Sequence, residues 1–286
     1  MKFADKLGHA FVVTAELDPP RGPDPAATIH EASALIGLVD GVNVSDSPMA
    51  HLRMSSTVTA SLVQSATGLT TIAHLTCRDR NVLALQADLL GAHALGVRFV
   101  LCLRGDPPTR GDHPEATGVF ELGADGLASL ARNLNEGRSL TGRDLGAATS
   151  FGIGVALNPT NPDLPAEVAR LGEKLAAGAT FAQTQPVFSR EDAQRFLDAV
   201  GTPPIPILFG VLPIRSVKMA QNVSRWAKVP AELLSEVEAR GKAAGIEWSA
   251  RLVEELRDLG AAGVHLYPLG KPEVVASVLR ASVAAD

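Results

Sequence analysis

Eight short apolar segments alternate with stretches of helical periodicity along the whole chain of 286 residues. The segments are rich in β-branched residues and are closed by Pro, Gly or charged residues, which predicts strands. The predicted strands cover residues 11–16, 39–45, 70–76, 99–103, 151–157, 180–186, 207–212 and 263–269. A helix between each strand and the next requires parallel pairing with right-handed crossovers.

Strict alternation of eight strands with helices predicts a (β/α)8 barrel of the TIM type, in the α/β class. The predicted helices cover residues 25–38, 55–65, 81–95, 125–135, 167–177 and 190–200, with a last helix that runs through residue 279. Three more, at 217–226, 231–240 and 246–259, form a helical insert before the last strand. No linker or change of composition divides residues 1–286, which predicts a single domain. An open, doubly wound sheet is the alternative that the same pattern allows.

The composition favours a compact protein that binds small molecules. The net charge of −5 provides no basic surface for nucleic acid or anionic lipid, and only 4% of the residues are aromatic. No apolar run reaches the ~18 residues of a membrane span, and the first residues lack the apolar core of a signal peptide. We therefore expect a cytoplasmic protein with no nucleic-acid or membrane partner. Cys77 and Cys102 are expected to be reduced thiols.

Polar side chains follow the predicted strands at the points where they end. The run 99–103 has no polar alternation and is followed by Arg104, Gly105 and Asp106. The other strand ends carry Glu16, Ser45, His74, Asn158, Gln185 and Lys271. In a barrel the carboxyl ends of all strands face one rim, where ligands bind, so we expect these residues to form one site. Residues 109–120, with their Gly and Pro, are expected to form a long loop at the same rim.

Three of these residues indicate particular chemistry. Glu16 lies shortly before Pro19-Pro20, and burial at a barrel mouth would raise its pKa toward that of a general acid. A helix-capping or surface acid is the alternative for this residue. The carboxylate of Asp106 and the amide of Gln185 suit the donor and acceptor edges of a heterocycle. His74 has no second ligand at metal-binding spacing, so no metal site is expected.

Six segments, each at a predicted strand end and in the same order, resemble those of the 5,10-methylenetetrahydrofolate reductases of the compact bacterial type. They are residues 14–20 (TAELDPP), 43–46 (NVSD), 73–77 (AHLTC), 103–106 (LRGD), 178–185 (GATFAQTQ) and 265–267 (HLY). The resemblance extends from about residue 11 to residue 271 and includes the polar strand ends described above.

The resemblance implies an enzyme that reduces 5,10-methylenetetrahydrofolate to 5-methyltetrahydrofolate. A flavin, usually FAD, would lie at the rim, be reduced by NADH or NADPH, and pass a hydride to the folate. Glu16 corresponds to the acid that opens the imidazolidine ring, Asp106 to the acid that binds the pterin and tunes the flavin, and Gln185 to an amide that contacts the substrates. The implied cofactor-binding positions are Ser45, His74, Arg104, Gly105, Asp106, Asn158 and Lys174, and Lys271 is expected at the substrate.

Some positions depart from the family pattern. An arginine that commonly precedes Lys174 is Glu173 here, an aromatic position is Asn158, and Met219 and Val223 replace residues that touch the substrates. Loss of a charge-assisted phosphate contact weakens FAD binding. The alternatives of bound FMN, or of no bound flavin, therefore stay open. Direct hydride transfer from NAD(P)H to the folate is one alternative, and a folate-binding subunit that obtains electrons from a partner is another. The sequence also leaves a homo-oligomer open. A barrel aldolase is disfavoured, because it would need a lysine at a strand end inside the barrel and none is predicted there.

Overall fold

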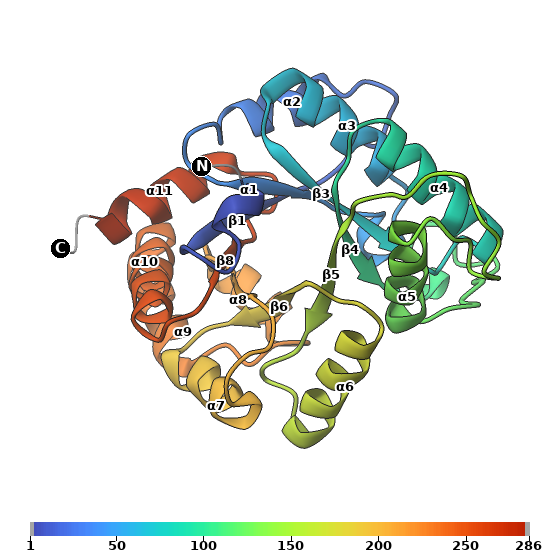
Figure 1. Cartoon of the computed structure of the whole chain (residues 1–286). Helices are drawn as coiled ribbons and strands as arrows, with labels where there is room; N and C mark the ends of the chain where they lie inside the picture. Colours follow the sequence, from blue (N-terminus) through green and yellow to red (C-terminus); the bar gives the residue numbers. More distant parts are fainter. Residues whose placement is uncertain (1–2, 284–286) are drawn as a thin grey trace.

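The computed structural model describes residues 3–283, and eight parallel strands form a closed barrel at its centre (Figure 1). Each strand pairs with the next one along the chain, and β8 pairs with β1. The strands are β1 Val12–Leu17, β2 Gly41–Val44, β3 Thr70–Thr76, β4 Phe99–Leu103, β5 Gly152–Leu157, β6 Phe181–Val187, β7 Ile207–Val211 and β8 Gly263–Leu266. This confirms the predicted (β/α)8 barrel, and the pairing of β8 with β1 excludes the open sheet.

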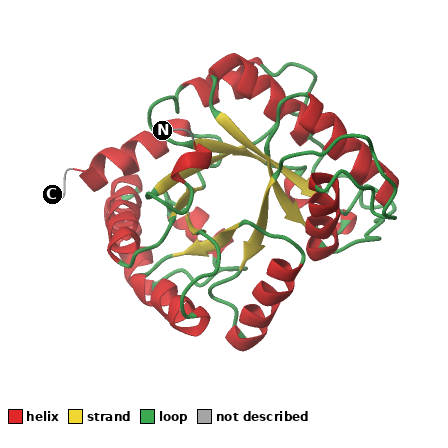
Figure 2. Ribbon diagram, viewed as in Figure 1, coloured by secondary structure: helices red, strands yellow, loops and turns green. Residues whose placement is uncertain are grey.

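A layer of helices surrounds the strands (Figure 2). It contains α2 Ala26–Ser33, α3 Ser56–Thr67, α4 Val82–Ala94, α5 Ala124–Asn135, α6 Leu164–Ala176, α7 Arg190–Val200 and α11 Pro272–Val283. Between β7 and β8 the chain adds α8 Val217–Val223, α9 Ala231–Arg240 and α10 Lys242–Asp258, which confirms the predicted insert. Within residues 3–283, no helix combines the length and hydropathy that crossing a bilayer requires.

Several element ends differ from the prediction by a few residues. Helix α2 ends at Ser33 rather than at residue 38, because the N–H groups of residues 35, 36 and 38 bond to carbonyls three residues back and form turns. The short helix α1 Phe3–Lys6 is not predicted by the sequence pattern. Two turns of 3-10 helix, η1 Pro48–Ala50 and η2 Pro108–Arg110, lie in the loops after β2 and β4, and η2 takes up the start of the predicted rim loop.

Aromatic rings fill the amino-terminal end of the barrel. The ring of Phe3, from α1, contacts Phe99 and Phe181 edge-on, with centroids 4.8 and 6.4 Å apart. Gly152 and Gly154 of β5 leave the room for these rings, because a Cβ on either glycine would lie 2.4 Å from the Phe99 or the Phe181 ring. The two glycines therefore serve core packing. With this end filled, a ligand meets the polar residues of the barrel from the carboxyl-terminal rim.

Candidate active site

A layer of polar side chains lies above the apolar end of the barrel. Strand alternation points one residue from each of five strands inward, and all five are buried: Thr14, Asn43, His74, Gln183 and His265. The Asn43 amide donates to Gln183 Oε1 at 2.6 Å and to His74 Nε2 at 2.9 Å, and Gln183 donates back to Asn43 Oδ1 at 3.1 Å. Burial lowers the pKa of His74 to about 4, so its ring is neutral at pH 7 and Nε2 can accept this bond.

His265 has one ring nitrogen bonded and one without a partner. Its Nδ1 lies 2.9 Å from Thr14 Oγ1, and the Thr14 hydroxyl in turn donates to the carbonyl of Val264 at 3.4 Å. We therefore assign the proton to Nδ1. The other nitrogen, Nε2, is buried, makes no hydrogen bond, and lies 3.9 Å from Glu16 Oε2.

Glu16 lies directly above this histidine, near the end of β1. Burial is the largest influence on its carboxyl and raises the pKa, but the neighbouring His265 and His74 together bring the pKa below its ordinary value. The expectation of a raised pKa is therefore wrong for the ligand-free protein, in which Glu16 is a carboxylate at neutral pH. A ligand that displaces water from the rim adds desolvation and shifts the pKa upward.

A cavity of about 310 Å³ opens at the carboxyl-terminal rim above the polar layer. Its volume lies at the lower end of the range for small-molecule pockets. Seven of the predicted site residues line it: Glu16, Ser45, His74, Arg104, Gly105, Asp106 and Gln185. Three other predicted residues are not among its lining residues: Asn158, Lys174 and Lys271. The ends of β1, β2, β3, β4 and β6 thus meet at one site, and the end of β5 does not contribute to it.

The turn after β4 shapes one wall of the cavity. Gly105 has φ +89°, and a Cβ there would lie 2.9 Å from the Cβ of Thr76, so only glycine lets this turn pack so closely on β3. Arg104 stacks over the Phe120 ring at 4.4 Å. Asp106 forms an exposed ion pair with Arg110 at 3.0 Å. Pairs of this kind contribute little, so the Asp106 carboxylate can exchange its partner for a ligand.

A register shift in β6 presents Gln185 at the rim. The pairing with β7 is irregular between Gln183 and Pro186, and the ladder is completed by Thr184, whose Oγ1 accepts the N–H of Gly210 at 2.9 Å. Bulges of this kind re-aim a side chain next to a site. The side chain of Gln185 is consequently exposed in an otherwise buried strand.

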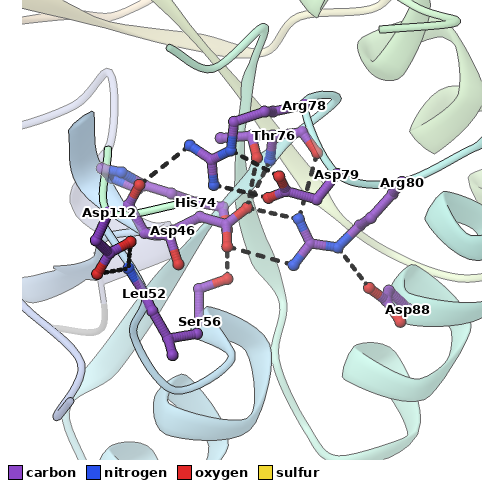
Figure 3. A network of polar contacts seen from close by, with 11 residues as sticks. Asp46, Leu52, Ser56, His74, Thr76, Arg78, Asp79, Arg80, Asp88 and Asp112 are labelled. Carbon is purple, nitrogen blue, oxygen red and sulfur yellow. Dashed lines mark hydrogen bonds and ion pairs between the residues drawn. The ribbon is translucent and has the colours of Figure 1, made fainter. Parts of the chain in front are cut away.

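A buried ion-pair network fixes the ends of β2 and β3 beneath the rim (Figure 3). Asp46, two residues after the end of β2, accepts bonds from the N–H and hydroxyl of Thr76, both at 2.9 Å, and from Arg80 at 2.7 Å. Arg80 also pairs with Asp88 of α4 at 2.8 Å. Asp46 belongs to the strand-end segment 43–46, and the sequence pattern assigns it no role of its own. The signal for its role is an acid two residues after one strand and an arginine four residues after the next.

The end of β5 is organised around its own residues. The Lys174 ammonium donates to the carbonyl of Ala156 at 2.7 Å, and burial lowers its pKa. Glu167 is buried and accepts the N–H of Asn158 at 2.9 Å. The side chain of Asn158 accepts bonds from Thr160 at 3.0 and 3.2 Å. Lys174 and Asn158 thus bond to residues around the end of β5, and neither is among the residues that line the rim cavity.

Neither a metal centre nor a reactive thiol stands out at the rim. In the described part of the chain, no three His, Cys, Asp or Glu side chains gather in a way that could hold a metal ion. Burial raises the pKa of Cys77 to about 11 and that of Cys102 further, so both are thiols at neutral pH.

Comparison with known proteins gives a match along nearly the whole chain. A family model described as Methylenetetrahydrofolate reductase matches residues 2–283. The 5,10-methylenetetrahydrofolate reductase of Pectobacterium carotovorum subsp. carotovorum is 26% identical over 285 residues, which cover 92% of this chain and 87% of that protein. Methylenetetrahydrofolate reductase 1 of Schizosaccharomyces pombe is 24% identical and the probable methylenetetrahydrofolate reductase (NADPH) of Caenorhabditis elegans is 27% identical, over 77% and 79% of this chain. The matches span only 36% and 34% of these two eukaryotic proteins.

Solved structures share the barrel at lower identity. An uncharacterized protein from Clostridium thermocellum, which binds two copies of 5-methyl-5,6,7,8-tetrahydrofolic acid, has a TM-score of 0.69 and 15% identity, over 96% of this chain and 95% of that chain. A 2,3-dimethylmalate lyase has a TM-score of 0.54 and 11% identity, over 96% of this chain and 80% of that chain. These likenesses show the fold.

Proposed function

The chain belongs to the methylenetetrahydrofolate reductase family, and from that premise we propose that its rim cavity reduces 5,10-methylenetetrahydrofolate to 5-methyltetrahydrofolate with NAD(P)H as the source of the hydride. The observation that carries the proposal is Glu16, which lies 3.9 Å from the buried Nε2 of His265 and lines a cavity that also presents Asp106 and Gln185. The folate-bound barrel from Clostridium thermocellum supports a folate ligand for this fold. The longer eukaryotic relatives carry further sequence, so the activity is proposed for this chain from its own site.

Asp106 and Gln185 are proposed to orient the pterin. A carboxylate accepts two parallel N–H donors, such as the amino group and ring N–H along one edge of a pterin. The Gln185 amide, which also lines the cavity, offers both a donor and an acceptor. Since both side chains lie at the cavity wall, the ring system would stand between them, above Glu16.

Glu16 is proposed to donate the proton that opens the imidazolidine ring. Protonation of folate N10 breaks its bond to the methylene carbon and leaves an iminium at N5, to which the hydride adds to give the methyl group. Binding of the substrate would desolvate Glu16 further, which raises the pKa of its carboxyl and favours the protonated form. Each turnover consumes one proton and one hydride.

The rim cavity has room for the rings of the flavin that the family implies, but the end of β5 is poorly suited to bind its phosphates. The rim cavity of about 310 Å³ can take one flat ring system. At the end of β5, however, Lys174 is bonded to the carbonyl of Ala156, and the acid Glu173 precedes it. Arg170, on the same helix, is paired with Glu167 at 2.7 Å. The residues present at this strand end therefore do not fit a flavin phosphate. Direct hydride transfer from the nicotinamide to the folate, without a flavin, is for this reason the second candidate for the reaction.

Absorption spectroscopy and steady-state kinetics separate the two sources of the hydride. Purified protein is assayed with methylenetetrahydrofolate and NADH or NADPH, with and without added FAD. Direct transfer predicts a colourless protein, turnover that does not depend on FAD, and intersecting double-reciprocal lines, because both ligands are bound at once. A visible flavin spectrum with parallel lines would support the flavin. Folate binding without turnover until a second protein is added would contradict both and favour a partner-dependent subunit.

A further inference from the structure

The segment that follows β7 carries positive charges and no negative one. Residues 213–230, which contain α8, include Arg215, Lys218, Arg225 and Lys228, but no Asp or Glu. The chain as a whole has a net charge of −5, so this positive segment differs from the rest of the molecule. We call these four side chains the α8 cations.

The α8 cations have no acidic partner within the structure. Lys218, Arg225 and Lys228 are exposed, and among residues 3–283 none of them forms an ion pair. Arg215 donates to the carbonyl of Pro268 at 3.1 Å. By contrast, α5, α6, α7 and α10 each carry an arginine that is paired with an acid. A group of like charges without counter-charges attracts an anionic ligand.

The α8 cations lie at the carboxyl-terminal mouth of the barrel. Helix α8 follows the carboxyl end of β7 and appears within the ring of strands in Figure 1, whereas α2 to α7 surround that ring. The bond of Arg215 to Pro268 joins the start of α8 to the residue directly after Tyr267. The Tyr267 ring contacts the His265 ring edge-on at 4.5 Å, and His265 Nε2 lies 3.9 Å from Glu16. A short path thus leads from the proposed acid to α8.

We propose that the α8 cations bind the carboxylates of the folate tail, and that this site takes a folate with several γ-linked glutamates. The proposal rests on the proposed function. Because Glu16 must reach folate N10, the aminobenzoyl-glutamate attached to N10 begins above Glu16, at the end of β1, which pairs with β8. The cavity of about 310 Å³ is taken up by the pterin, so the tail leaves it over the rim. The α8 cations lie at this rim, on the side of β8.

The spacing of the cations favours an elongated anion. Helical backbone hydrogen bonds continue from α8 as far as Ala227, so Lys218 and Arg225 are about two turns, or ~10 Å, apart along the axis. Folate with one glutamate ends in two neighbouring carboxylates, and each further γ-linked glutamate adds one carboxylate along the chain. Several glutamates can therefore meet cations that are two turns apart. A single terminal glutamate, or the compact pyrophosphate of a dinucleotide, meets only part of the row.

Calorimetric titration with two forms of tetrahydrofolate tests the proposal. Tetrahydrofolate lacks the methylene group that is reduced, so the titration reports binding alone. The wild type is expected to bind tetrahydrofolate pentaglutamate at least about tenfold more tightly than the monoglutamate, as several exposed charge pairs together would give. The ratio of the two dissociation constants should fall as the ionic strength rises, because salt screens exposed charges.

Variants of the α8 cations assign the preference to this segment. Replacing Lys218, Arg225 and Lys228 together by Gln removes the charges and keeps side chains that favour a helix. This triple variant is expected to bind the two folates with dissociation constants within about twofold of each other. Arg225→Gln alone should lower the ratio in part. Circular dichroism checks that each variant is folded.

Arg143→Gln is the matched control for Arg225→Gln. Arg143 is also exposed, and among the described residues it forms no ion pair. It precedes β5, in the loop after α5, and so belongs to the amino-terminal end of the barrel. Arg143→Gln removes the same charge from the chain, and the ratio of the two dissociation constants should stay at the wild-type value.

Trp226 provides a local readout that does not depend on activity. Its side chain is 59% exposed and lies between Arg225 and Lys228 in the sequence. The two folates carry the same pterin, so a difference between their effects on tryptophan emission reports the tail. The pentaglutamate is expected to change the emission more than the monoglutamate does. This difference should vanish in Trp226→Phe, which keeps Trp248, the other tryptophan of the chain.

The outcomes separate this subsite from the proposed reaction. Equal affinity of the wild type for the two folates, or a preference that the triple variant retains, would overturn the subsite and leave the reaction standing. A triple variant that loses affinity for ADP-ribose while its folate ratio stays unchanged would also overturn it, because the cations would then serve the nucleotide. Failure of the wild type to bind either folate would contradict the proposed function as well.

Discussion

Replacing Glu16 by Gln is expected to lower kcat for methylenetetrahydrofolate reduction by about 10²–10⁴, the usual contribution of a general acid. Glutamine has the same shape and keeps a hydrogen-bonding group beside His265, but it cannot protonate folate N10. Folate binding should therefore persist while the ring-opening step fails. A single-turnover experiment, in which the 5-methyltetrahydrofolate formed is measured at saturating substrate, isolates this step from product release.

Asp18→Asn is the matched control for Glu16→Gln. Asp18 is another acid at the end of β1, it accepts a bond from Ser45 at 2.7 Å, and it is not among the residues that line the cavity. Its variant should keep most of the activity. In the wild type, kcat should fall as the pH rises through the pKa of Glu16 in the substrate complex, because kcat reports the groups of that complex, and this limb should disappear in Glu16→Gln. A Glu16→Gln variant with wild-type kcat would exclude Glu16 as the acid.

The second large effect concerns folding stability. Asp46→Ala is expected to lower the free energy of unfolding by about 3 kcal/mol, at the lower end of the ~3–5 kcal/mol that removal of one partner from a buried ion pair costs. The Asp46 side chain is 4% exposed, and its loss leaves Arg80 and the hydroxyl of Thr76 without this partner. The remaining contact of Arg80 with Asp88 moderates the loss. Urea denaturation measures the difference in the free energy of unfolding between the variant and the wild type, provided that both have the same m-value.

Glu136→Ala serves as the surface comparison for Asp46→Ala. The Arg132–Glu136 pair is 3.9 Å long and half exposed, and such pairs contribute little to stability. Its unfolding midpoint should stay close to that of the wild type. If Asp46→Ala shifts the midpoint no further than Glu136→Ala does, the buried network does not hold the ends of β2 and β3 as described.

The barrel and much of the rim follow from local patterns. Apolar runs with helices between them define the strands. The residue at each strand end is directed to the rim by the barrel itself and does not depend on contacts between residues distant in sequence. The cavity accordingly includes Glu16, Arg104 and Gln185. The bond of Lys174 to the carbonyl of Ala156 does not follow from the sequence pattern, because it depends on how α6 packs on β5.

Interactions between residues distant in sequence limit the prediction of chemistry. The pKa of Glu16 depends on His265, which comes from the last strand and reaches β1 only because the barrel closes. Burial alone predicts a raised pKa, and the histidine reverses the direction. Polar His265 and Tyr267 alternate with apolar Val264 and Leu266, which indicates that His265 faces inward. The alternation does not indicate that Glu16 is the residue beside it.

The most direct test of the proposed reaction follows the fate of the hydride. Purified protein is incubated with methylenetetrahydrofolate and with NADH or NADPH in which both hydrogens at C4 of the nicotinamide are deuterium, and the mass of the folate product is measured by mass spectrometry. The account predicts 5-methyltetrahydrofolate with one deuterium in its methyl group for direct transfer, and solvent hydrogen in that methyl group if a flavin mediates. Recovery of unreduced folate with both nucleotides, also in the presence of added FAD, would contradict the account.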